Sequence, residues 1–161
     1  MLPDEVCNKQ RRSADVFLPS WSAGSPVTLD FAVTTPQRQV TLTDAARHRL
    51  AAASSYSDHK RAYLNTEGLC ADAGIAFIPM VAETTGAWAP DATKVLKQLA
   101  ASSATLTGTD PDIALQHILQ NAAIRIRRAN ARASLRRSAD APAEADAHSQ
   151  RLTAQSVLEA M

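Results

Sequence analysis

A nearly unbroken apolar run at residues 75–82, IAFIPMVA, constrains the fold of this chain more than any other segment. It follows Gly74, which suits the end of a helix, and it has the length of a strand. A strand that is apolar at successive positions is typical of a sheet covered by helices on both faces. Pro79 lies inside the run and has no amide hydrogen, so it predicts an edge position or a bulge.

Two shorter β-prone segments and a long helical segment precede this run. Residues 14–18 and 27–33 are each stopped by a proline and are joined by the turn-rich segment 20–26, which predicts a loosely connected hairpin. Residues 41–73 have helix-forming composition, with a break expected near Ser54 and Ser55 and a second helix over residues 57–70.

Two further helices are predicted after the apolar run. The first has Asp91 as its cap, ends at about residue 102 and buries a stripe of Val95, Leu96 and Leu99. The second begins at Asp110 and Pro111. The apolar positions of its expected buried face are Leu115, Leu119, Ala122, Ile126, Ala129 and Ala133. The elements together predict an α/β fold, a small mixed sheet flanked by helices and followed by C-terminal helices.

The length of 161 residues fits one domain with tails. We assign residues 1–13 to a ragged N-terminal segment, 14–137 to the domain and 138–161 to a flexible acidic tail. The sequence has no apolar run of membrane-spanning length and no apolar signal-peptide core at residues 1–12, so we expect a nuclear or cytoplasmic protein that is not secreted and has no membrane partner. Cys7 and Cys70 fit neither a zinc motif nor a disulfide framework and are expected to stay reduced.

Charge is strongly segregated along the chain, although the net charge is only +1. Residues 121–137 contain six arginines and no acid, whereas residues 138–161 contain four acids and one arginine. Four of the arginines recur at three- or four-residue steps, so a helix presents them as a line suited to phosphates. They are Arg125, Arg128, Arg132 and Arg136. A solvated helix face paired with the acidic tail is the alternative explanation.

Acidic, basic and aromatic residues follow a recognisable order along the predicted elements. Asp15 and Asp30 lie in the two β-prone segments, Lys60 and Tyr63 in the helical segment, and Glu83 after the apolar run. The segments are ADV at 14–16, LDFAVT at 29–34, KRAY at 60–63 and FIPMVAETTGAW at 77–88. In this order they resemble the restriction-like endonuclease domain, of the PD-(D/E)xK type, in the C-terminal region of non-LTR retroelement reverse transcriptase polyproteins.

The resemblance implies a restriction-endonuclease-like core that hydrolyses phosphodiester bonds in DNA. Asp15 and Asp30 would hold Mg²⁺, with Mn²⁺ as a substitute and a backbone carbonyl near residue 31 as a further ligand. Lys60 would supply positive charge or position the water, and Tyr63 would orient Lys60 or touch a phosphate. DNA is the implied partner, and no small-molecule cofactor is implied. Because relatives carry a reverse transcriptase upstream, the resemblance also implies a detached fragment.

The chain departs from the family pattern at two positions. Ala32 stands where the motif has lysine, so catalysis depends on Lys60 reaching the same point, and Ala14 stands where proline is usual. Three interpretations therefore stay open: a Mg²⁺-dependent endonuclease, a degenerate copy that binds nucleic acid without cutting it, and a structural remnant in which Asp15 and Asp30 cap turns or pair with arginines. Glu83 is expected to be a surface-loop acid.

Overall fold

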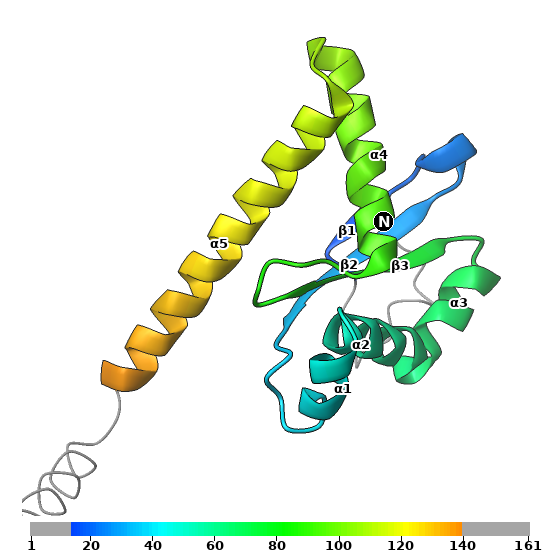
Figure 1. Ribbon diagram of the computed structural model, residues 1–161. Helices are drawn as coiled ribbons and strands as arrows, with labels where there is room; N and C mark the ends of the chain where they lie inside the picture. The colour runs from blue at the N-terminus through cyan, green and yellow to red at the C-terminus, as the bar shows by residue number, and fades with distance from the viewer. Residues whose placement is uncertain (1–13, 140–161) are drawn as a thin grey trace, which may run out of the picture. The chain divides into compact units, whose positions relative to one another are not determined.

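The computed structural model describes residues 14–139, so the expectations for residues 1–13 and for the tail from residue 140 onward lie outside the described part. The described residues form a mixed α/β structure in which helices accompany a three-stranded sheet (Figure 1). The chain divides into two compact units, Met1–Arg127 and Arg128–Met161. The predicted α/β class with a mixed sheet is confirmed.

The sheet has the strand order β1-β2-β3. Strand β1 (Val16–Leu18) pairs antiparallel with β2 (Val27–Thr34), as the predicted hairpin requires, and the short helix η1 (Ser22–Gly24) lies in their connection. Strand β3 (Ala76–Glu83) runs parallel to β2 in an unbroken register from Val27↔Ala76 to Thr34↔Glu83. A parallel pair needs a long crossover, and residues 35–75 supply it.

The crossover contains more breaks than its composition predicts. It consists of α1 (Leu42–Arg47), α2 (Ala51–Ala62), η2 (Tyr63–Asn65) and α3 (Thr66–Asp72). The break predicted near Ser54 and Ser55 was wrong, because both lie inside α2. The helices are interrupted where the φ of Leu50, Leu64 and Asn65 is 63°, 51° and 53°. A left-handed residue cannot continue a right-handed helix, and only asparagine among these signals it in sequence.

Strand β3 is an edge strand of the described sheet, which agrees with the edge position predicted from Pro79. The Val81 carbonyl accepts from Ala89 N at 2.9 Å and Glu83 N donates to the Ala87 carbonyl at 2.7 Å, so odd-numbered residues direct their backbone groups away from β2. Pro79 shares that orientation. Its missing N–H therefore removes no hydrogen bond to β2, and the strand needs no bulge.

Helices cover both faces of the sheet: Figure 1 shows α2 and α4 (Pro90–Thr107) on opposite sides of it. The buried core cluster comprises Val27, Leu29, Ala53, Met80, Val81, Ala89, Ala92, Val95 and Leu96. Helix α4 runs beyond the predicted end at residue 102, and Ala89 rather than Asp91 occupies its N-cap position. The predicted apolar stripe was wrong at Leu99, which is 38% exposed, since small alanines such as Ala100 and Ala104 line the buried face instead.

Helix α5 (Pro111–Ala139) begins as predicted. Asp110 Oδ1 accepts from Asp112 N at 2.9 Å and from Ile113 N at 3.2 Å, which is the hydrogen bonding of an N-cap. Leu115 packs against the core, but none of the predicted apolar face is fully buried and Ala129 is exposed. A helix of 29 residues rises about 44 Å, more than the diameter of a small domain, so one core cannot cover its length.

Candidate functional site

The register of the hairpin places Asp15 beside Asp30. Val16 pairs with Leu29, so the next step along both strands brings residue 15 opposite residue 30. Asp15 lies just before the first residue of β1, and its Oδ2 accepts a hydrogen bond of 2.7 Å from Phe31 N. The carboxylate replaces the backbone acceptor that a longer β1 would have offered. Since N–H and C=O of one strand residue point the same way, the Phe31 carbonyl also faces the side where Asp15 lies.

Lys60 reaches Asp30 from the crossover helix. Its Nζ donates to Asp30 Oδ2 at 2.5 Å, and the two side chains are 17% and 26% exposed. A charge-assisted hydrogen bond between half-buried partners fixes the ammonium group more firmly than a fully exposed ion pair does. The structure thus brings Asp15, Asp30 and Lys60 to one end of the hairpin, although they are 15 and 30 residues apart in sequence.

The oxygens of the two aspartates fit a hard divalent cation. Within residues 14–139, Oδ1 of Asp15 and Oδ1 of Asp30 accept no hydrogen bond, because the contacts of both residues use Oδ2. The described part of the chain has no group of three or more His, Cys, Asp or Glu side chains placed to hold a metal. Mg²⁺ is commonly held by one or two carboxylates with water and substrate phosphate oxygens. Asp15 and Asp30 suit that type of site and not a closed cage of protein ligands.

Tyr63 lies at the edge of the site and contacts a different partner from the one expected. It is 57% exposed, follows the last residue of α2, and its ring is 5.8 Å from that of His59. The ring nearest Lys60 belongs to Tyr56, whose centroid is 6.0 Å from the ammonium nitrogen. Tyr56 was not predicted to be near the site, although its position four residues before Lys60 on a helix is a signal for contact.

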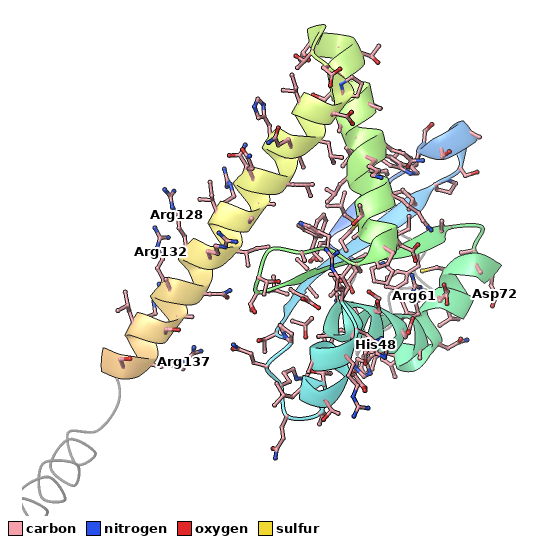
Figure 2. All side chains as sticks on the ribbon, viewed as in Figure 1. His48, Arg61, Asp72, Arg128, Arg132 and Arg137 are labelled. Atoms are coloured by element: carbon pink, nitrogen blue, oxygen red, sulfur yellow. The ribbon has the colours of Figure 1, made fainter. Side chains whose placement is uncertain are left out.

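Arg61 ties the neighbouring helices together beside the site (Figure 2). Its guanidinium contacts Asp58 at 3.1 Å, Glu67 at 3.4 Å and Asp91 at 2.5 Å, which lie on α2, α3 and α4. Hydrogen bonding to Lys94 lowers the pKa of the Asp91 carboxyl, and Arg61 lowers it further, while burial acts in the opposite direction. Arg61 is therefore committed to holding α2 in place, which leaves Lys60 as the cation directed at Asp30.

Glu83 was wrongly expected to be a surface-loop acid, because the structure buries it to 6% exposure. Its Oε1 accepts from Ala53 N in the first turn of α2, and its Oε2 accepts from Thr85 Oγ1, both at 3.4 Å. Leu50, at the N-cap position of α2, makes no side-chain capping bond. The Glu83 carboxylate on β3 thus accepts from a backbone N–H in the first turn of α2, where the N-cap residue of the helix provides no side-chain acceptor.

The arginine line predicted on the last helix is solvent-exposed. Arg125, Arg128, Arg132 and Arg136 are all exposed, and none of them forms an ion pair within residues 14–139. Arg125 belongs to the first compact unit, and the other three belong to the second. Figure 2 shows Arg128 and Arg132 projecting from one side of α5 and Arg137 from another. Pairing of this line with the acidic tail lies outside the described residues.

Within the described residues, no helix combines the length and the apolar character needed to cross a membrane. Comparison of the chain with protein-family models, with curated proteins and with solved structures finds no match.

Proposed function

We propose that this chain is a Mg²⁺-dependent, endonuclease-like domain of retroelement origin that hydrolyses phosphodiester bonds in DNA. The observation that carries the proposal is the 2.5 Å contact between Lys60 and Asp30, with Asp15 placed opposite Asp30 by the strand register. Two carboxylates at one end of a hairpin, one of them bound to a lysine, are groups that suit metal-dependent phosphodiester hydrolysis. A restriction-endonuclease-like core belongs to the same proposal, supported by the hairpin and the parallel third strand.

Each residue of the site has a defined task in this proposal. When bound, Mg²⁺ polarises the phosphate and lowers the pKa of its bound water. Asp15 and Asp30 offer their Oδ1 oxygens as ligands, while Phe31 N and Lys60 hold the Oδ2 oxygens and fix both carboxylate planes. Lys60 places a positive charge beside the position where charge increases on the phosphate during hydrolysis. Lys60 thereby replaces the lysine that the family motif has at the position of Ala32 on β2.

The direct test of this function is metal-dependent nicking of supercoiled plasmid by the purified full chain. We expect conversion to open circles with Mg²⁺ or Mn²⁺ and none in EDTA, because the carboxylates alone cannot activate water. Open circles that form equally in EDTA would point to a contaminating or metal-independent activity, and no conversion with either metal would contradict the proposal.

A second candidate function, DNA binding without cleavage, is favoured by the exposed arginines of the second unit. Arg128, Arg132 and Arg136 recur every four residues on α5 and so lie along one side of the helix, with no acidic partner within residues 14–139. Exposed guanidinium groups in a row can each contact a phosphate of a nucleic-acid backbone. This function needs no metal and would survive the loss of the carboxylate site.

The combined substitution Arg128→Ala with Arg132→Ala tests this binding surface. We expect weaker DNA binding and a salt dependence whose log–log slope falls by about two, because each lost phosphate contact removes about one released counterion. Fluorescence anisotropy between about 50 and 200 mM salt measures both quantities. Arg137→Ala is the control for position, since it removes one arginine charge from another side of α5 and should lower the slope by less than the double variant does. An unchanged slope in the double variant would exclude these arginines from DNA binding.

A further inference from the structure

A row of rings runs from α2 into η2, and its first member lies near Lys60. Tyr56, His59 and Tyr63 follow one another with ring centroids 5.9 and 5.8 Å apart and tilts of 41° and 43°. The row includes both tyrosines of a chain in which aromatic residues make up only 4%. Lys60 joins it to the site, because its ammonium group lies 6.0 Å from the Tyr56 ring and binds Asp30.

Exposure increases along the row away from the core. Tyr56 is partly buried against the core cluster, His59 is exposed and Tyr63 is 57% exposed. Packing explains Tyr56, since it covers apolar residues beneath it. Packing does not account for the exposed part of Tyr63, since more than half of the residue is open to solvent and His59 lies beside its ring. Tyr63 therefore presents an open aromatic surface at the outer end of the row.

We propose that Tyr63, backed by His59, stacks an unpaired nucleobase of single-stranded DNA next to the carboxylate site. An aromatic ring stacks on any base through its π-face, but only a base that is released from its own helix is available. The charge of nearby residues supports the same ligand: Arg47, the last residue of α1, and Arg49, in the connection from α1 to α2, are exposed and form no ion pair within residues 14–139. A DNA strand that lies along α2 would meet the arginines that precede the helix at one end and the rings of His59 and Tyr63 at the other.

This inference rests on the proposed function for the identity of the ligand as DNA, but it makes a separate claim about structure preference. The site selects DNA with an unpaired nucleotide beside the phosphate that it holds. A contact with the phosphate backbone alone would not distinguish single strands from duplexes of the same charge density. The preference for single-stranded over duplex DNA arises from the Tyr63 ring and does not require a bound metal.

The test compares the binding of one fluorescein-labelled oligonucleotide, single-stranded and as a duplex, by the full chain in EDTA. Tyr63→Ala is expected to weaken single-strand binding by about 5- to 150-fold and to leave duplex binding unchanged, because one stacked base contributes about 1–3 kcal/mol. Tyr63→Phe should bind as the wild type does, since it retains the ring. Leu106→Ala, which removes another exposed apolar side chain (87% exposed) on α4, is the matched control.

The outcomes separate this inference from the proposed nuclease function. A selective loss in Tyr63→Ala that Tyr63→Phe rescues supports base stacking, even where the wild type nicks no plasmid. Equal losses for single strands and duplexes, or binding by Tyr63→Ala equal to that of the wild type, overturn base stacking, even where plasmid nicking is robust. Circular dichroism of Tyr63→Ala checks folding, and His59→Ala provides a second variant with the same expected selectivity.

Discussion

The Asp30→Ala variant is expected to nick supercoiled plasmid about 10²–10³-fold more slowly than the wild type in Mg²⁺. The substitution removes one of the two carboxylates of the proposed site and also the partner that fixes Lys60 at 2.5 Å. Without Asp30 the proposed site has one carboxylate fewer for the metal, and Lys60 is no longer held in place. Both changes slow the reaction, because water activation and stabilisation of the phosphate charge are weakened. The measurement is the initial rate of open-circle formation at several Mg²⁺ concentrations.

Two further variants distinguish loss of chemistry from loss of structure. Asp30→Asn keeps an oxygen for Lys60 but removes the charge, so it should fold as the wild type does and still lose most of its activity. Asp72→Ala removes an exposed acid at the end of α3 and should nick normally. Wild-type rates in Asp30→Ala would remove this carboxylate from the mechanism and with it the assignment of the site.

The second large effect is expected for stability. Met80→Ala should lower the free energy of unfolding by about 2–5 kcal/mol, a large share of the roughly 5–15 kcal/mol that typical domains have. Met80 is 0% exposed, lies in the middle of β3 and belongs to the core cluster that helices cover from both faces. The truncation leaves a cavity between layers that cannot fully collapse. Urea denaturation followed by circular dichroism measures the change.

Leu106→Ala serves as the comparison for Met80→Ala. Leu106 is 87% exposed near the end of α4, so its truncation should change stability by no more than about 0.5 kcal/mol. Similar denaturation midpoints for the two variants would show that the layer around Met80 is not the core of the fold.

The strands could be predicted from sequence because their signals are local. The apolar run that became β3, the two β-prone segments and the cap at Asp110 each lie within a few neighbouring residues. The interruptions of the crossover could not be predicted, since Leu50 and Leu64 adopt positive φ without being glycine or asparagine. Tertiary contacts hold such residues in a conformation that their own propensity opposes.

The candidate site could be predicted only in part from the sequence. The two β-prone segments on either side of a turn predicted that Asp15 and Asp30 lie on neighbouring strands, whereas the register that sets residue 15 opposite residue 30 is given by the structure. Lys60 was expected near them only from the resemblance. The burial of Glu83 was not predictable, because its partner Ala53 lies 30 residues earlier and on another element. A buried acid that caps a remote helix looks in sequence like any acid at the end of a strand.

Pro79 also affects how the molecule meets other copies of itself. An exposed sheet edge invites another extended chain to pair with it, which is a common first step in aggregation. The second half of the outer edge of β3 is already covered by residues 87–89, and the first half includes the proline. Pro79 has no N–H to donate, so one carbonyl of an incoming strand would find no hydrogen-bond partner on β3. At the opposite edge β1 is only three residues long, too short to guide a stable pairing.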